Sequence, residues 1–265
     1  MNNYKVFIGT GWWCTENDVR EERFLQGSDE IRGQLFSKKW LRSVNKYCDY
    51  SKIIMIDSAS PIKPSLQDDK IEILELPINL GHASRMNHDK YCGWTASVLL
   101  SMEYCSFSDA DYYVYIEQDV LLKGNIIEKV ISELPNSDYI FGASDNFVQP
   151  LQQSFFIVKR SAIDTFVSRY RAIDKSDFLI SPEFKFAIAS SRFWSSLPSC
   201  LFTAKSTRIG KVKRRILAFL FKYIKGYSVM NYGYGRSRPI NFCSDYLYFQ
   251  HGSTEELLEY ERVTK

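Results

Sequence analysis

The sequence predicts an α/β fold in which short buried strands alternate with amphipathic helices. Short continuous apolar runs recur along the chain and end in polar or glycine-containing turns, as buried strands do. Stretches with apolar residues at helical spacing lie between them. Over residues 4–122 the order is strand, helix, strand, strand, helix, strand, which is that of an α/β nucleotide-binding fold.

Composition narrows the class of protein. At 265 residues, with 45% hydrophobic and 25% charged residues, the chain is globular and long enough for one large α/β domain or two small ones. A net charge of +3 is too small to indicate a nucleic-acid partner. The six cysteines form no CxxC pair, which argues against a zinc site or a disulfide scaffold and fits a reducing cytoplasm. The amino-terminal residues do not read as a signal peptide, and no run approaches the ~20 apolar residues of a membrane span.

The first two predicted strands end in candidate ligand-binding residues. Lys5–Ile8 is followed by Gly9-Thr10-Gly11, where small residues allow a backbone to approach a ligand, so Thr10 and Gly11 are candidates. A helix is expected over Gln34–Asn45, and a second strand over Lys52–Ile56. That strand ends at Asp57, whose carboxylate can meet a ligand at the sheet edge or simply form an Asx-turn.

A third strand over Ile71–Leu76 leads into a polar turn that contains Asn79 and Gly81. A helix is expected over Asn87–Glu103, and Arg85 lies just before it.

The strongest motif is the acidic triplet that follows the fourth strand, Tyr112–Ile116. Burial alone does not explain Glu117 and Asp119, because desolvating a carboxylate costs several kcal/mol without compensation. Ligands bind at the carboxyl ends of strands in open α/β sheets. The triplet Glu117-Gln118-Asp119 therefore predicts a divalent metal held against a phosphorylated substrate; a solvated acidic turn is the alternative.

The second half carries further candidates. The expected elements are a helix over Ile126–Leu134, strands over Tyr139–Ala143 and Ser154–Val158, and a helix over Ser161–Tyr170 capped by Ser161. Asp145 follows the first of these strands. Ser181-Pro182 predicts a helix start, where Glu183 is either a dipole partner or a functional carboxylate. A last strand-like run ends in His251, whose role depends on whether the chain folds it back near Asp119.

The segment Lys205–Lys225 contains eight basic residues and no acid, interleaved with apolar residues. This composition is typical of a helix lying on an anionic membrane surface. Nucleic acid is the rival partner, and a solvated helix is the third interpretation.

These pieces, in this order, resemble the GT-A family of nucleotide-sugar glycosyltransferases. The likeness rests on Ile53–Ser58 with Pro61, on Asn79–Ala83 and on Tyr113–Asp119, and residues 4–122 carry most of it. It implies a mixed sheet flanked by helices in a single domain, 1–265. Residues 1–122 would form the nucleotide-sugar-binding half, and residues 123–265, including the basic segment 205–225, a variable acceptor half.

The resemblance also assigns roles. Asp57 would contact the nucleoside, Asn79 and Gly81 would lie at the diphosphate, and the triplet would hold Mn²⁺ or Mg²⁺ with His251 as a further ligand. The triplet is Glu-Gln-Asp rather than Asp-x-Asp, which leaves Asp119 as the direct ligand and Glu117 acting through water or on the ribose.

The expected activity is metal-assisted transfer of a sugar from a nucleotide sugar, with UDP-sugars favoured, to a glycan or lipid-linked acceptor. A divalent ion neutralises the departing diphosphate, and Arg85 with the adjacent helix start adds positive potential. An inverting reaction needs a carboxylate base, for which Glu183 is favoured over Asp145. The chain is expected in the cytoplasm, bound peripherally to the inner face of the membrane. A sugar-phosphate nucleotidyltransferase and a non-catalytic nucleotide- or carbohydrate-binding module are the alternatives.

Overall fold

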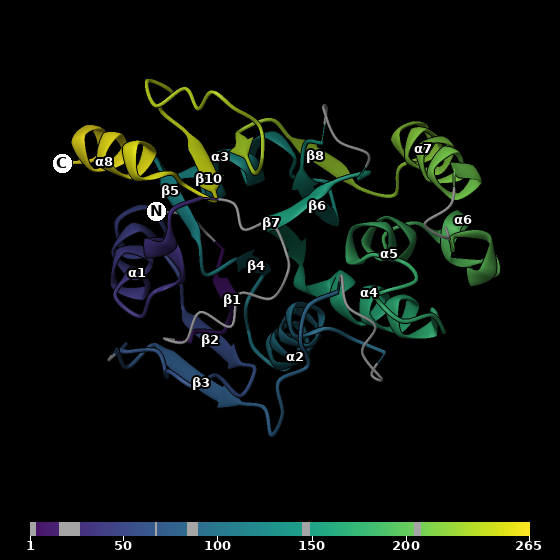
Figure 1. Ribbon diagram of the computed structural model, residues 1–265, viewed down its shortest axis with the longest axis horizontal. Helices are drawn as coiled ribbons and strands as arrows, with labels where there is room; N and C mark the ends of the chain where they lie inside the picture. The colour runs from purple at the N-terminus through teal and green to yellow at the C-terminus, as the bar shows by residue number, and fades with distance from the viewer. Residues whose placement is uncertain (1–3, 16–26, 67, 84–89, 145–148, 204–207) are drawn as a thin grey trace.

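A seven-stranded sheet with the order β3-β2-β1-β4-β7-β6-β8 forms the centre of the protein (Figure 1). The computed structural model describes residues 4–15, 27–66, 68–83, 90–144, 149–203 and 208–265. The strands of this sheet are β1 Val6–Trp12, β2 Lys52–Asp57, β3 Ile71–Glu75, β4 Tyr112–Ile116, β6 Tyr139–Gly142, β7 Gln152–Lys159 and β8 Ser228–Met230.

The sheet is mixed. β1, β2, β3 and β4 pair in parallel, β7 runs antiparallel to both β4 and β6, and β8 is parallel to β6. The chain passes from β1 outward through β2 and β3, then returns to β4 on the other side of β1. The boundary between β1 and β4 is therefore the topological switch point, where open α/β sheets bind ligands.

Helices cover both faces of the sheet, which confirms the expected mixed α/β architecture (Figure 1). One apolar layer contains residues of α2 Gly93–Ser106, α4 Arg160–Ala172, α5 Pro182–Ala189 and α7 Arg208–Tyr223. The other contains residues of α1 Phe36–Tyr47, α3 Ile126–Glu133 and α8 Thr254–Val263. Side chains of β4 alternate between the layers: Tyr113 and Tyr115 face the first, Val114 and Ile116 the second.

The remaining elements are short. The helix α6 spans Arg192–Ser195, and the 3-10 turns η1 and η2 span Asp29–Arg32 and Ser199–Leu201. No helix among the described residues is long and apolar enough to cross a membrane.

A second, three-stranded sheet returns the carboxyl-terminal part of the chain to the segment after β4. Its order is β5-β10-β9, with β5 Val120–Lys123, β10 Leu247–Gln250 and β9 Gly233–Tyr234. β10 pairs antiparallel with β5, so that Gln250 lies opposite Val120. This register carries the residue after Gln250 toward Asp119.

Two expectations about local structure are wrong. The first strand does not end at Ile8 but continues through Trp12, so Thr10 and Gly11 lie within it. A Cβ at Gly9 would lie 2.3 Å from the Tyr113 hydroxyl, and one at Gly11 2.7 Å from Ser97 Oγ. The glycines therefore make room for polar side chains of the core, which explains them without a ligand. Ser161 does not cap α4 either, because the helix begins at Arg160 with Lys159 as its N-cap.

Candidate functional site

The carboxyl ends of β1 and β4 are joined by the side chain of Gln118. The backbone N–H of Trp13 donates to Gln118 Oε1 at 2.8 Å, and Gln118 Nε2 donates to the Trp13 carbonyl at 3.1 Å. The middle residue of the acidic triplet thus has a structural role. Gln118, which lies between Glu117 and Asp119 in the sequence, links the ends of the two strands at the switch point.

A tight turn between β4 and β5 presents the triplet. The N–H of Glu117 donates to the Ser154 carbonyl at 2.9 Å, and the N–H of Val120 donates to the Glu117 carbonyl at 3.0 Å. Both acids are half-buried. Their backbone is therefore fixed by β7 on one side and by the start of β5 on the other.

β10 brings two further side chains to these acids. Gln250 Nε2 donates to Glu117 Oε2 at 2.8 Å and to Asp119 Oδ1 at 3.1 Å. His251 Nδ1 lies 2.9 Å from Asp119 Oδ2. The structure therefore brings together Glu117, Asp119 and His251, three residues that the sequence pointed to, and adds Gln250.

The backbone of His251 is held in an unusual conformation. Its φ is +58°, in the left-handed region that non-glycine residues adopt rarely and at an energetic cost. Arg238 donates to the carbonyls of Gln250 at 2.8 Å and of His251 at 3.2 Å, and the Ser28 N–H donates to the Gly252 carbonyl at 2.8 Å. These bonds stabilise the conformation that turns the imidazole toward Asp119.

The electrostatics of the site centre on Glu117. Burial, followed by the negative charges of Asp119 and Glu183, holds the pKa of Glu117 well above its usual range, against the hydrogen bond from Gln250 and the charge of Arg236. Glu183 and Arg236 therefore act on the same site from α5 and from the loop after β9. Arg236 and Gln250 were missed by the sequence reasoning, although Arg236 belongs to a basic, glycine-rich stretch and Gln250 directly precedes His251.

The raised pKa of Glu117 makes a prediction about stability. A carboxyl group with a higher pKa in the folded state binds its proton more tightly there than in the unfolded chain. Its contribution to stability therefore falls as the pH rises through and above the ordinary carboxyl range. Glu117→Gln cannot ionise and therefore avoids this loss of stability. In metal-free buffer the variant should be more stable than the parent, by a margin that grows from about pH 5 to about pH 8.

Chemical denaturation at several pH values measures that margin. The control is Asp164→Asn, which changes an exposed carboxylate on α4 and should show no such trend. If the stability advantage of Glu117→Gln over the parent shrinks as the pH rises, the pKa of Glu117 is not raised in the folded protein.

The site offers a small set of possible ligands for a divalent metal. Within the described ranges, no three carboxylate, histidine or cysteine side chains form a ready-made ligand group. The Gln250 amide instead engages one oxygen of each carboxylate. Among the described residues, however, His251 Nδ1 is buried and makes no hydrogen bond, although it lies beside Asp119 Oδ2. This pair fits a cation that takes its other ligands from phosphate oxygens and water, as Mg²⁺ commonly does.

Asp57 follows β2 at the same sheet edge, but its carboxylate has internal partners. Its Oδ1 accepts the Ser60 N–H at 2.9 Å, and its Oδ2 lies 2.8 Å from Lys63 Nζ, with the side chain fully buried. The carboxylate thus closes the turn after β2 by accepting from the residue three positions on, one position beyond the bond of the Asx-turn that the sequence left as an alternative. A nucleoside contact by Asp57 stays a prediction.

The turn of Asn79 and Gly81 lies against the start of α2. Asn79 Oδ1 accepts the Gly81 N–H at 2.8 Å, and the Gly81 carbonyl accepts the N–H of Gly93, the first residue of α2, at 2.9 Å. Gly81 has a φ of +69°, which favours glycine. Arg85, the second cationic candidate beside this turn, and Asp145, the second candidate base, lie outside the described residues.

Glu183 occupies the first turn of α5, after Ser181 as N-cap and Pro182 at the first position, as expected. The next turn of this helix is anchored by a buried ion pair between Lys185 Nζ and Asp177 Oδ1 at 2.7 Å. Asp177 Oδ2 also accepts the N–H of Cys92, the N-cap of α2, at 2.8 Å. One carboxylate therefore ties together the starts of α2 and α5.

Further polar groups at this sheet edge have no hydrogen-bond partner among the described residues. They are the buried side-chain oxygens of Ser144, which follows β6, and of Gln153 and Ser154, at the start of antiparallel β7. Buried polar atoms without partners are uncommon and call for an explanation such as a bound ligand. Their position extends the candidate site across the sheet edge from β4 toward β6.

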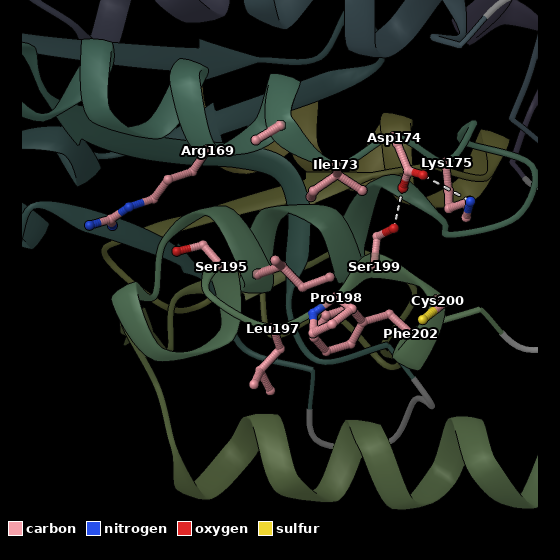
Figure 2. A pocket seen from close by; sticks show the side chains of 12 residues that line it. Arg169, Ile173, Asp174, Lys175, Ser195, Leu197, Pro198, Ser199, Cys200 and Phe202 are labelled. Atoms are coloured by element: carbon pink, nitrogen blue, oxygen red, sulfur yellow. Dashed lines mark hydrogen bonds and ion pairs between the residues drawn. The ribbon is translucent and has the colours of Figure 1, made fainter.

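Two hollows elsewhere are separate from this site. One, of about 380 Å³, lies between the end of α4 and the α6–η2 segment. Figure 2 shows Asp174 there, which accepts a hydrogen bond from Ser199 and forms an ion pair with Lys175. The other, of about 550 Å³, lies at the opposite sheet edge beside Tyr4 and Tyr47. Neither is lined by residues of the acidic triplet or by His251.

No family model and no curated protein matches the sequence. The chain is similar to two crystal structures of S. aureus TarS, at 10% identity in both cases, with 98% of this chain covered. The TM-score is 0.43 for TarS 1-349 and 0.44 for the other structure, and 64% and 38% of those chains are covered. The chain thus spans less than two thirds of either, and likeness at this level assigns no family.

Proposed function

We propose that this protein is a metal-assisted glycosyltransferase that moves a sugar from a nucleotide-diphosphate sugar, with UDP-sugars favoured, to a glycan or lipid-linked acceptor. The observation that carries the proposal is the cluster of Glu117, Asp119 and His251 at the switch point between β1 and β4. Charged groups at a sheet's switch point, next to unpartnered polar groups, favour a bound polar ligand over a solvated turn.

Each residue has a distinct task in this reaction. Asp119 and His251 would hold Mn²⁺ or Mg²⁺, which when bound supplies positive charge for the departing diphosphate. Arg236, whose charge acts on Glu117, would add positive potential to the same site. The turn of Asn79 and Gly81, at the start of α2, would lie along the diphosphate.

Glu183 is the proposed base of an inverting reaction. It is half-buried in the first turn of α5, and its charge reaches Glu117. In this role its carboxylate accepts the proton of the acceptor hydroxyl as that oxygen attacks the sugar. Glu117 would act on the ribose or through water. The hydrogen bond from Gln250 and the buried surroundings orient its carboxylate.

Calorimetric titration with UDP, with and without Mn²⁺, tests the proposal. UDP should bind in the presence of Mn²⁺ and bind at least about tenfold more weakly after chelation, because the phosphate charge then loses its partner. ADP, which carries adenine in place of uracil, is the matched control for recognition of the nucleobase. A panel of UDP-sugars should then show slow metal-dependent hydrolysis of one member.

Three outcomes would contradict the proposal. Absence of any nucleotide binding with Mn²⁺ would remove the donor site altogether. Binding of UDP without hydrolysis or transfer of any sugar would instead indicate a non-catalytic module. Formation of nucleotide sugar from a nucleoside triphosphate and a sugar phosphate would identify a nucleotidyltransferase.

A further inference from the structure

The helix α7, Arg208–Tyr223, has two apolar faces. One packs on the protein through Leu217, Ala218 and Phe221, of which Phe221 is fully buried. The other is formed by Val212, Ile216, Phe219 and Tyr223, which are 55–74% exposed. Their spacing of four, three and four residues places them on one stripe, roughly opposite the buried face.

This exposed stripe is ordered and continuous. The rings of Phe219 and Tyr223 contact each other with centroids 4.6 Å apart. Leu220 and Ile224 add further exposed apolar surface at the end of the helix. A soluble protein normally hides a stripe of this kind, so its exposure indicates an interaction surface.

The charge around the stripe is of one sign. The helix contains six basic residues and no acid. Lys211, Arg214 and Arg215 are exposed, whereas Lys213 and Lys222 point back to the protein, where they donate to the carbonyls of Thr203 and Ser144. The exposed cations therefore accompany the apolar stripe on the solvent side.

The helix lies at the edge of the molecule (Figure 1). Its last turn is nonetheless connected to the candidate site, because Lys222 Nζ donates at 3.2 Å to the carbonyl of Ser144, which follows β6 at the carboxyl edge of the sheet. This hydrogen bond joins the last turn of α7 to the sheet edge that carries the candidate site.

We propose that α7 lies on an anionic lipid bilayer, with Val212, Ile216, Phe219 and Tyr223 inserted below the headgroups and the exposed cations at the phosphate level. A bilayer satisfies both features at once, since its acyl region accommodates the apolar stripe and its anionic headgroups pair with the cations. Nucleic acid would pair with the cations and leave Val212 and Ile216 in water. The docking is independent of the sugar-transfer chemistry. Only its link to a lipid-linked acceptor rests on the proposed function.

Vesicle co-sedimentation tests this docking with the full chain. The protein should bind vesicles that contain about 30 mol% phosphatidylglycerol far better than pure phosphatidylcholine vesicles, and binding should weaken from about 50 to about 300 mM salt. The double variant Phe219→Ser/Tyr223→Ser should lose binding by about tenfold or more, because two inserted rings no longer leave water. Its control, Phe107→Ser/Leu258→Ser, changes two large apolar side chains that are also exposed but lie away from α7, and it should bind as the parent does.

The contribution of the cations to vesicle binding can be measured separately from that of the apolar stripe. Lys211→Gln/Arg215→Gln should weaken binding to the anionic vesicles by about 30-fold, since each cation near such a surface contributes about 1 kcal/mol. Lys38→Gln/Arg42→Gln removes two exposed cations from α1 instead and should have a small effect.

Binding that ignores anionic lipid and salt would overturn the proposal. So would equal binding by the α7 variants and their controls. A dimer that dissociates in Phe219→Ser/Tyr223→Ser would identify a second copy of the chain as the occupant, and α7-dependent binding to duplex DNA would identify nucleic acid. UDP titration of the same variants keeps the two proposals apart, because loss of vesicle binding with intact UDP binding contradicts only the docking.

Discussion

Asp119→Asn is expected to lower kcat/KM for sugar transfer by on the order of 10²–10³-fold while leaving the fold intact. The substitution keeps the size and shape of the side chain and an oxygen that can accept from Gln250 Nε2. It removes the anionic oxygen that lies 2.9 Å from His251 Nδ1. The pair proposed to hold the cation then loses its charge, and the departing diphosphate loses its neutralising partner.

Two readouts separate this effect from unfolding. The variant should melt at or above the temperature of the parent, because the like charge next to Glu117 is gone. Stabilisation by Mn²⁺ with UDP should disappear from its thermal melts. Asp164→Asn, on the outside of α4, is the control and should transfer sugar normally. If Asp119→Asn keeps both transfer and the Mn²⁺-dependent stabilisation, the metal assignment is wrong.

The framework of the site could be predicted because each strand that builds it has a local pattern. The apolar run of β4 is followed by two acids, and the rule that ligands bind at the carboxyl ends of parallel strands was enough to predict a site there. Likewise, Ser181-Pro182 marked the start of α5, where Glu183 lies as expected. Local patterns of this kind were sufficient for six of the seven strands of the central sheet and for the placement of the acidic triplet, whereas the three-residue strand β8 was not predicted.

Contacts between distant segments could not be predicted in the same way. Gln250 reaches Asp119 over 131 positions, through the pairing of β10 with β5, and a glutamine at a strand end has no chemical signature. Gly9 and Gly11 suggested room for a ligand, but they accommodate side chains that come from β4 and α2. Lys185 would be placed at the surface by its residue type, yet it is fully buried. In each case the partner, rather than the residue itself, decides the role.

Lys185→Met is expected to lower the free energy of unfolding by about 3–5 kcal/mol, which is the usual loss when one member of a buried ion pair is removed. Both side chains of this pair are almost completely buried, and burial lowers the pKa of Lys185 while Asp177 opposes that shift. The variant would leave the Asp177 carboxylate buried without its cation. Urea denaturation at neutral pH measures the loss.

Asp177→Asn/Lys185→Met should recover a large part of that stability, because no charge is then buried and the asparagine oxygen can still accept the Cys92 N–H. Lys129→Met, which breaks an exposed pair with Glu133 on α3, is the control and should have little effect. If the double variant is less stable than Lys185→Met, the pair does not act as a charge-compensated unit.

Sugar transfer by the double variant addresses the function of the same contact. Asp177 ties the start of α2, beside the proposed diphosphate turn, to α5, where Glu183 is the proposed base. A neutral pair holds the two helix starts less firmly, so kcat should fall even where stability has recovered, with KM for the nucleotide sugar changed less. If the recovered double variant keeps the full kcat, the ion pair stabilises the fold without contributing to the positioning of Glu183.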